Sequence, residues 1–322
     1  FYTFPGNVKL EMGYHYKSIT QNPVAIAAGV NEVDFLTTTV NIVYGGTVKY
    51  STGGWPIITF PFEMLQADHT LKFGNTVKTI TVSGCTMDGS VLIANLYNSN
   101  GQGVKDGVVA LGVGGWPVIG STDENGQFFY FYNGTLGNMR LKMTAPNYGG
   151  TETSAVQYIP TNSVFNFQTQ QIAIKLLNND GTTPMNGGVV AIGFGGWPVI
   201  GETGDSGETG ILYHEHFLMP RTFRMYYNGT GDEISQDLAL DQTVVFQTMQ
   251  AEIHLLDHAG NFMDGGKVQF GIGGWPVIGY TGNSGTGKLF HEIFEGTYSY
   301  KLSINYGTQT INQDVGANPI VV

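Results

Sequence analysis

The chain has little of what enzymes and many secreted proteins rely on. Its 322 residues include one cysteine, Cys85, so an internal disulfide framework is excluded. Only 12% of the residues are charged, and the net charge is −11. An acidic, weakly charged chain with no basic stripe predicts no nucleic-acid partner. No apolar run approaches the roughly 18 residues that a membrane-spanning helix needs, so we expect no membrane insertion in this segment.

Sequence motifs of catalysis are also missing. The chain has no Gly-x-Ser-x-Gly elbow, no His-Glu-x-x-His pair and no phosphate-binding loop. Residues 282–288 resemble a phosphate loop only superficially, because no Ser or Thr follows Lys288. We therefore predict that the chain is not an enzyme, and we expect no cofactor.

What the chain does have is one repeated phrase that contains all four tryptophans. It reads Gly-Gly-Trp-Pro at residues 53–56 and Gly-Gly-Trp-Pro-Val-Ile-Gly at residues 114–120, 195–201 and 273–279. Successive tryptophans are 61, 81 and 78 residues apart, which is the size of one small β-domain. A repeat of this length predicts tandem copies of one module.

The copies align along their length as short strands separated by turns. Apolar opening segments at 92–96, 172–176 and 251–255 each lead into a turn of Asn, Asp and Gly. Two copies end in nearly the same sequence, at 164–169 and 244–248. No long segment has helical periodicity. These features predict an all-β protein, a tandem array of small antiparallel β-sandwich modules.

We divide the chain into five parts: 1–37, 38–90, 91–169, 170–248 and 249–322. The first aligns with the C-terminal half of a module, and two explanations stay open. The sequence is a window on a longer array, or a neighbouring chain completes the half-module, since unpaired strand edges are costly. The second part is a short module that keeps Trp55 and Pro56, and we expect it to have lost its later hairpins.

The pattern resembles the prealbumin-like, or carboxypeptidase-regulatory-like, Ig-like β-sandwich repeats of microbial cell-surface proteins. The resemblance rests on the Asn-x-Asp-Gly turn ahead of Gly-Gly-Val-Val (178–190), the Thr-Asp-x-Asn-Gly turn (122–126) and the Gly-Thr-Tyr hairpin (296–298). It implies a β-sandwich fold and an extracellular, cell-surface location. The Gly-Gly-Trp-Pro phrase is not part of that family pattern, so the tryptophans need their own explanation.

The repeated tryptophan-proline pairs are the first candidate site, as an interface or a ligand platform. They are Trp55, Pro56, Trp116, Pro117, Trp197, Pro198, Trp275 and Pro276. If the strand runs straight through the glycines, Trp116 lies on the polar face, where it stacks on a sugar or anchors a neighbouring domain. If Gly114-Gly115 is a two-residue hairpin turn, Trp116 lies on the core face with Val118. We favour the hairpin, because Gly-Gly between apolar strands is a hairpin signal.

The other candidates are weaker. Asn133 and Asn228 begin Asn-Gly-Thr sequons and are candidate glycosylation sites. Asp123 and Asp205 stand in acidic turns and are weak Ca²⁺ candidates, since neither turn has the ligand spacing of an EF-hand. His254 and His258 are too far apart along a strand and turn to share a metal ion. We predict no metal site.

Our leading hypothesis is a non-catalytic extracellular structural protein, a rod or filament of tandem modules that self-associates. It would act as a surface stalk, fibre, sheath or adhesin shaft. The alternative is a polysaccharide-binding array that uses the repeated Trp-Pro edge. A third reading makes the modules accessories of a surface hydrolase. Iodide should quench most of the tryptophans only if they form an exposed binding edge.

Overall fold

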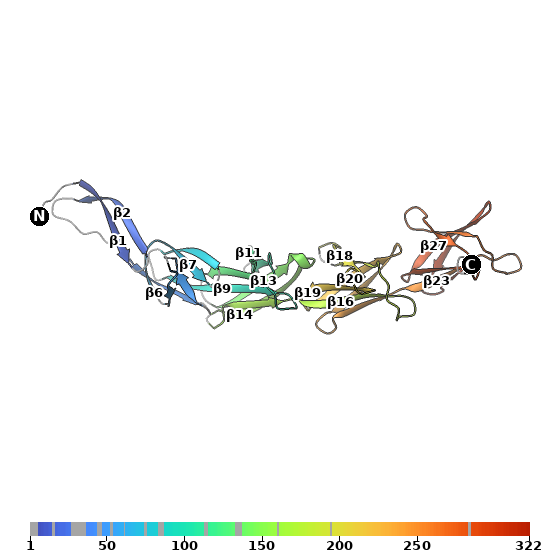
Figure 1. Cartoon of the computed structure of the whole chain (residues 1–322), viewed down its shortest axis with the longest axis horizontal. Coiled ribbons are helices and arrows are strands. Elements are labelled where there is room, and N and C mark those ends of the chain that lie inside the picture. The colour runs from blue at the N-terminus through green and yellow to red at the C-terminus, as the bar shows by residue number, and fades with distance from the viewer. Residues whose placement is uncertain are drawn as a thin grey trace. The chain divides into compact units, whose positions relative to one another are not determined.

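The computed structural model describes residues 6–14, 17–26, 37–43, 47–51, 54–60, 62–73, 76–82, 87–112, 115–132, 137–159, 161–193, 195–282 and 285–322. Within these residues the regular structure is β-strand, apart from one short 3-10 helix, η1 (Pro146–Tyr148). The predicted all-β class is confirmed (Figure 1). No helix in the described ranges is long and apolar enough to cross a bilayer. Cys85 and Asn133 lie outside the described residues.

The chain forms two compact units, which are residues 1–144 with 152–168, and residues 145–151 with 169–322. Strands β1 to β15 belong mainly to the first unit: β1 (Gly6–Tyr14), β2 (Lys17–Ile26), β3 (Thr37–Val43), β4 (Val48–Tyr50), β5 (Ile57–Ile58), β6 (Phe62–Leu65), β7 (Asp68–Phe73), β8 (Thr76–Thr81), β9 (Met87–Tyr97), β10 (Val108–Leu111), β11 (Val118–Ser121), β12 (Gln127–Tyr132), β13 (Asn138–Ala145), β14 (Thr151–Tyr158) and β15 (Val164–Gln168).

The second unit contains the remaining strands: β16 (Gln170–Leu177), β17 (Val189–Ile192), β18 (Val199–Glu202), β19 (Ile211–His216), β20 (Pro220–Tyr227), β21 (Thr230–Asp237), β22 (Thr243–Gln247), β23 (Met249–His254), β24 (Lys267–Phe270), β25 (Val277–Tyr280), β26 (Lys288–Ile293), β27 (Thr297–Ile304), β28 (Gly307–Asp314) and β29 (Ile320–Val321).

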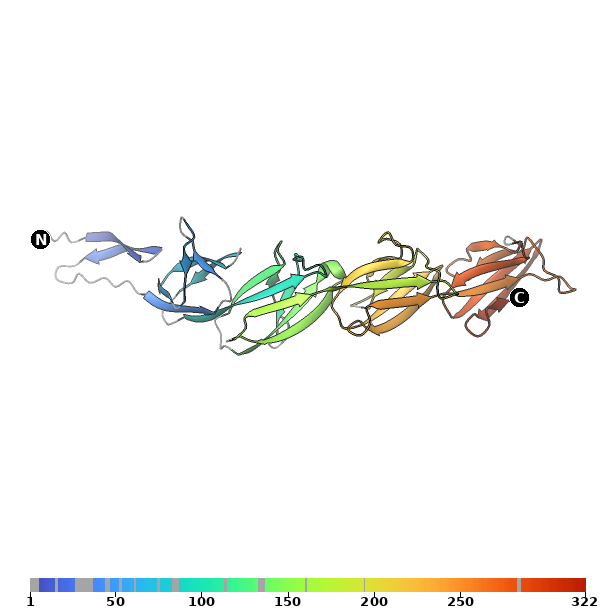
Figure 2. The same ribbon diagram turned by 60° about the horizontal axis from the view of Figure 1, so that its bottom comes forward.

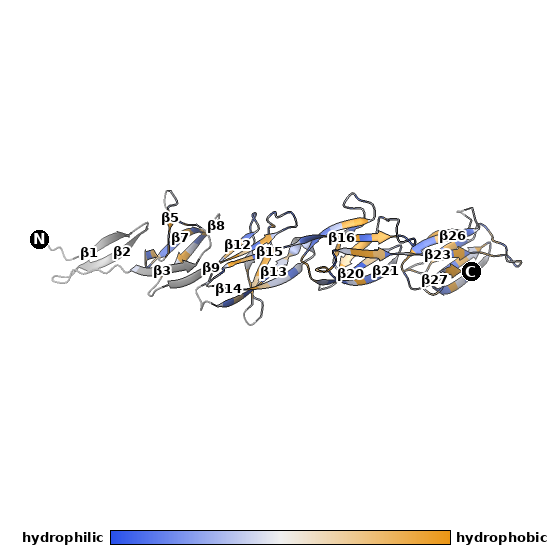
Figure 3. Ribbon diagram, turned by 90° about the horizontal axis from the view of Figure 1, so that it is seen from below, coloured by the Kyte–Doolittle hydropathy of each residue, from blue (hydrophilic) through white to orange (hydrophobic). Residues whose placement is uncertain are grey.

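The copy at 170–248 shows the plan of one module. In its first sheet, β16 lies between β19, which is antiparallel to it, and β22, which is parallel to it. The second sheet has the order β18-β17-β20-β21 and is antiparallel throughout. Alternate residues of β16, namely Ile172, Ile174 and Leu176, are fully buried and pack with Val190, Ile192, Phe223 and Met225 of the other sheet. The period-two pattern therefore places one face of each sheet in a common core (Figure 3).

The same plan recurs in the other copies (Figure 2). The last copy has the sheets β26-β23-β29 and β25-β24-β27-β28. The second copy has β9-β3-β6 and β5-β4-β7-β8, so it keeps both sheets. The expectation that it lost its later hairpins is wrong, since β7 and β8 form an antiparallel hairpin. The copy is short because an earlier connection is short: four residues separate β3 from β4, whereas eleven separate β16 from β17.

One continuous strand joins the second and third copies. The first part of β9, from Met87 to Ser90, pairs in parallel with β3. The later part, from Ser90 to Asn95, pairs with β12, and β15 adds in parallel from Ile93 onward. One strand thus closes one copy and opens the next, and the predicted boundary at residue 90 falls inside it. The division into five modules stays a prediction.

In each later copy, a buried threonine before the second turn forms hydrogen bonds with the backbone of the facing loop. Thr122, Thr203 and Thr281 are each 2% exposed. The Thr203 hydroxyl donates to the carbonyl of Met185 and accepts from the N–H of Gly188, at 2.9 and 3.0 Å. Thr122 and Thr281 make the same pair of bonds in their own copies. The repeated threonine therefore satisfies buried backbone groups where the strands diverge.

Histidines are buried in the cores of the last two copies. His214 and His216 lie one strand period apart on β19, with ring centroids 5.3 Å apart, and His216 is fully buried against Phe223. Burial, together with the nearby His214 and Arg221, lowers the pKa of His216 to about 3. Burial alone lowers the pKa of His291, on β26, to about 4. Both imidazoles are therefore neutral at pH 7.

Stability should fall in mildly acidic solution because of these histidines. Their folded-state pKa lies below the unfolded value of about 6.5, so the unfolded chain takes up the proton first as the pH drops. Each histidine should cost up to about 1.4 kcal/mol of unfolding free energy per pH unit below 6.5, down to its folded pKa. Urea unfolding at pH 7 and pH 5 measures this loss. His216→Phe should reduce the pH dependence, whereas changing the exposed His258 to Gln should leave it unchanged.

Candidate functional sites in the tryptophan loop and the module junction

The Gly-Gly-Trp-Pro phrase forms the tip of a hairpin. In the third copy, β10 and β11 pair from Val108 with Ser121 to Ala110 with Val118, and the N–H of Leu111 donates to the carbonyl of Pro117. The equivalent bond to the proline carbonyl closes the loop in the other three copies. Five residues, 112–116, thus connect the strands. The hairpin prediction is confirmed, but the connection is longer than the two-residue turn that we expected.

The tryptophans lie outside the core. None of the four is among the buried core residues of the described chain, and each is half-buried. Val118, which we expected on the core face with Trp116, is 66% exposed. That core-face placement is wrong, because a register shift between Val109 and Ala110 turns the returning strand. The tryptophans occupy the outward face of the four-stranded sheet instead.

Each tryptophan ring contacts a cation from the neighbouring long strand. Lys72 lies 5.6 Å from the ring centroid of Trp55, and Lys301 lies 4.1 Å from that of Trp275. Two cations, Arg140 and Lys142, lie 5.1 and 5.3 Å from the ring centroid of Trp116. The guanidinium carbon of Arg224 is 3.9 Å from the centre of the Trp197 ring. Such a contact contributes about 0.5–2 kcal/mol, depending on its exposure to water. A cation therefore fixes the position of the ring in every copy.

The first residue of each later loop is a glycine that leaves room for the ring. A Cβ atom added at Gly193 would be 3.3 Å from Trp197 Cη2 and 3.3 Å from the carbonyl of Thr222. Gly112 and Gly271 have the same relation to Trp116 and Trp275. A side chain four residues before the tryptophan would crowd the ring and the neighbouring strand, which favours glycine at that position.

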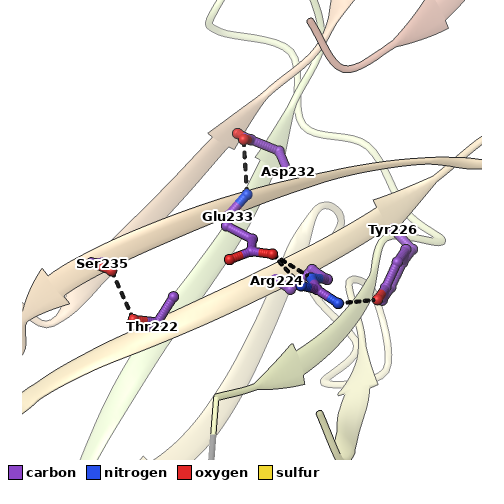
Figure 4. A network of polar contacts seen from close by, with 6 residues as sticks. All are labelled: Thr222, Arg224, Tyr226, Asp232, Glu233 and Ser235. Atoms are coloured by element: carbon purple, nitrogen blue, oxygen red, sulfur yellow. Dashed lines mark hydrogen bonds and ion pairs between the residues drawn. The ribbon is translucent and has the colours of Figure 1, made fainter. Parts of the chain in front are cut away.

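Arg224 is the centre of a polar network on the outward face of β20 and β21 (Figure 4). It forms an ion pair with Glu233 on the adjacent strand, and its Nη1 donates to the hydroxyl of Tyr226 at 2.9 Å. One rung away, the hydroxyls of Thr222 and Ser235 are hydrogen-bonded at 2.7 Å. The hydrogen bonds to Tyr226 and Glu233 raise the pKa of Arg224 above its ordinary value. The guanidinium is held on three sides, so the Trp197 ring rests on a fixed support.

The junction between the last two copies is the second candidate site. β22 ends at Gln247 and β23 begins at Met249, so a single residue, Thr248, separates the closing strand of one module from the opening strand of the next. Thr248 is 1% exposed, and its hydroxyl donates to Glu292 Oε2 at 2.7 Å. Gln250 donates to the other oxygen of Glu292 at 2.9 Å. Thr169 donates to Glu215 in the same way at 2.6 Å.

Aromatic packing reinforces this junction. Phe294, from the last module, is 1% exposed and belongs to the core cluster of the preceding module, where its ring lies 6.1 Å from that of Phe246. Its backbone N–H donates to the hydroxyl of Thr230 at 3.0 Å. The preceding module therefore completes its core with a residue of its successor, which couples the two modules.

The sequon at Asn228 takes part in the same junction. Asn228 adopts a positive φ of 47° and is exposed, and its Nδ2 donates to the carbonyl of Glu292 at 2.8 Å. Nδ2 is the atom that a glycan would modify, so a glycan there would replace this bond. Glycosylation at Asn228 stays a prediction.

The acidic turns use their carboxylates to stabilise themselves. Asp123 Oδ1 accepts from the N–H groups of Asn125 and Gln127, and Asp205 Oδ2 accepts from that of Glu202. These bonds account for the acidic residues as turn formers. No group of three His, Cys, Asp or Glu side chains that could hold a metal ion occurs in the described part of the chain. Ca²⁺ binding at either turn remains an untested prediction.

Comparisons with known proteins assign no family to this chain. No protein-family model and no curated protein matches the chain. Among solved structures, the chain is similar to the Bacillus anthracis TIE protein, with 11% identity over 92% of this chain and 74% of that one, and a TM-score of 0.23. It is also similar to BcpA, the major pilin subunit of Bacillus cereus, with 12% identity over 72% of this chain and 97% of that one, and a TM-score of 0.21. A streptococcal ancillary pilin is similar with 11% identity over 66% of this chain and 98% of that one, and a TM-score of 0.22.

The cations over the tryptophan rings were not predicted from the sequence, although their regular spacing from the tryptophans could have indicated them. Lys142, Arg224 and Lys301 follow their tryptophans by 26 or 27 residues in the three full-length copies. The spacing becomes meaningful only once the sheet order is known, because β13, β20 and β27 are the strands that pair with the strand before the loop.

Replacing Arg224 by Met should destabilise the tryptophan loop. The variant keeps an apolar stem against Trp197 but loses the guanidinium, and we expect a loss of about 1 kcal/mol in unfolding free energy. The indole N–H resonance of Trp197 should also broaden or shift. Lys78→Met, at an exposed lysine on β8, is the control and should change neither property. Equal effects of the two variants would contradict the role of the cation.

Replacing Phe294 by Ala should destabilise the module that precedes it. The cavity falls within the core of residues 170–248, so we expect a loss of about 3–5 kcal/mol there. Hydrogen exchange of β16 and β22 in the full chain reports on that module separately. Phe290→Ala, at a residue of β26 that is 40% exposed, is the control and should have a small effect. Unchanged protection of β16 in the Phe294 variant would refute the shared core.

Proposed function

We propose that this chain is a non-catalytic structural element of an extracellular rod or filament. It acts as a surface stalk, fibre, sheath or adhesin shaft. The observation that carries this proposal is the parallel pairing of the first and last strands of each module. β16 and β22 are parallel neighbours, as are β3 and β9, β9 and β15, and β23 and β29. The chain consequently enters a module at one end of the sheet and leaves it at the opposite end.

This topology suits a load-bearing role. A pull on the two ends of a module acts along β16 and β22 in opposite directions. Their hydrogen bonds lie across the direction of the pull, so the bonds share the load and do not open one after another. The buried bond from Thr248 to Glu292 and the ring of Phe294 transmit the load to the next module. Low charge and hydroxyl-rich outer faces are consistent with an extracellular structural protein.

Stretching single chains between their ends tests the mechanical part of the proposal. The modules should unfold one at a time, as a series of force peaks. The peaks from the larger modules should be spaced by roughly 250 Å, the extended length of about 79 residues less the folded length. Extension at low force without regular peaks would refute a load-bearing role.

Negative-stain electron microscopy of the protein isolated from its native source tests the assembly. Long unbranched fibres with a repeat of one or a few modules would support a filament formed by self-association. Discrete short particles would leave a monomeric stalk and would show that the self-association part is wrong.

A further inference from the structure

The four-stranded sheet of the last module ends in a strand that is paired on one side only. β28 pairs with β27 along its whole length, and no strand of the described chain pairs with its other side. The N–H of Val315 donates to the carbonyl of Gly296, so alternate residues back along β28 are the ones that hydrogen-bond to β27. The residues between them direct their backbone N–H and C=O groups outward and are exposed: Thr308, Thr310 and Asn312.

The equivalent edge strands of the two preceding copies carry acidic side chains. In the third copy, Glu152 on β14 forms an ion pair with Lys142 at 3.1 Å. In the copy at 170–248, Glu233 on β21 forms an ion pair with Arg224, and Asp232 precedes it on the same strand (Figure 4). A charged edge strand resists the addition of a strand from another chain, because its charge would be opposed or desolvated in the contact.

β28 lacks this protection. The residue that faces the ring cation Lys301 is Thr310, whereas Lys142 and Arg224 face glutamates at the equivalent place. Residues 307–313 contain no charged side chain and no proline, and their pairing with β27 runs without a register shift. Charge, proline and β-bulges are the usual features that keep an edge strand from pairing. The outer edge of β28 is therefore open to another strand.

We propose that β28 pairs with β28 of a second copy of this chain. The outward backbone groups are self-complementary in an antiparallel register that is centred on Thr310. In that register Thr310 faces Thr310 of the second copy and Thr308 faces Asn312, so every outward residue meets another outward residue. Three such pairs exchange about six backbone hydrogen bonds. The contact is isologous, because the same strand takes part on both sides of a two-fold axis.

The side chains near the axis fit this pairing. Threonines that face each other across two strands are a favourable pair, and no like charges are directly opposed in this register. Asp314, the acid at the end of β28, comes beside Tyr306 of the second copy, a turn residue whose side chain is fully exposed. A second copy of the chain therefore satisfies the free backbone groups of β28 without placing a charge against a like charge.

The inference rests on the proposed self-association and names the surface through which it occurs. A single pair of strands buries less than the roughly 1,200 Å² that stable complexes bury, so dimerisation of isolated chains should be weak and concentration-dependent. Copies held together in one assembly strengthen such a contact, because their effective concentration is high.

Sedimentation equilibrium of the full chain at increasing concentration tests the pairing. The native chain should dimerise, and Thr310→Glu should weaken dimerisation about tenfold, because two carboxylates then oppose each other at the axis. The fold should accept this change, since the new carboxylate faces Lys301 as Glu233 faces Arg224. Ser235→Glu adds the same charge to an exposed residue of β21; it is the matched control and should leave dimerisation unchanged.

A charge swap tests the two-fold register. Thr310→Lys should also weaken dimerisation on its own, whereas an equimolar mixture of Thr310→Lys and Thr310→Glu should dimerise at least as well as the native chain, because opposite charges then meet at the axis. Native-like hydrogen exchange in β23 checks that each variant is folded.

Three results would each overturn the proposal. They are a native chain that stays monomeric up to about 1 mM, a Thr310→Glu variant that dimerises as the native chain does, and a mixture that does not recover dimerisation. Long fibres in protein from the native source, found together with any of these results, would leave the filament intact and exclude only this surface.

Discussion

The parallel pairing of the first and last strands is the constraint on which the rest of each module depends. Two strands that run the same way in one sheet cannot be joined by a short turn, so the chain between them must cross to another layer and return. The four-stranded antiparallel sheet is that second layer. Its apolar face packs in the core, and its other face points outward and takes no part in core packing. The tryptophan loop lies on this outward face, where the Trp197 ring packs against Arg224.

The tryptophan loop joins two neighbouring strands of this outer sheet. β17 and β18 must be joined at the end of the sheet, and the connection carries a large indole that the core cannot accommodate. Glycine beneath the ring and a cation beside it let the indole cover the outward face without a cavity. Trp55 and Trp275 adopt positive φ values of 47° and 57°, which few non-glycine residues do, so contacts with the ring must offset that strain.

The fold class could be predicted from the sequence because strand alternation and turn residues act locally. The hairpin at Gly-Gly-Trp-Pro was predictable for the same reason. The side on which Trp116 lies was not, because a register shift of one residue reverses the face of a strand and leaves no mark in the composition. The second copy was misjudged because the short connection between β3 and β4 puts its strands out of alignment with those of the longer copies. The partners of the tryptophans and the position of Phe294 depend on contacts between distant segments, which no local pattern encodes.

The transfer of Phe294 into the preceding core has a consequence for how such a chain can be divided. The sequence repeat ends at Thr248, but the packed unit extends past it to Phe294, which directly follows β26. A fragment cut at the end of the repeat would expose Phe246 on one side of the cut and Phe294 on the other. Neither fragment would then retain the native packing of a single module. The smallest piece that retains native packing spans a module and the first sheet of its successor, so duplication, truncation and grafting of these modules have to respect an overlap of about half a module.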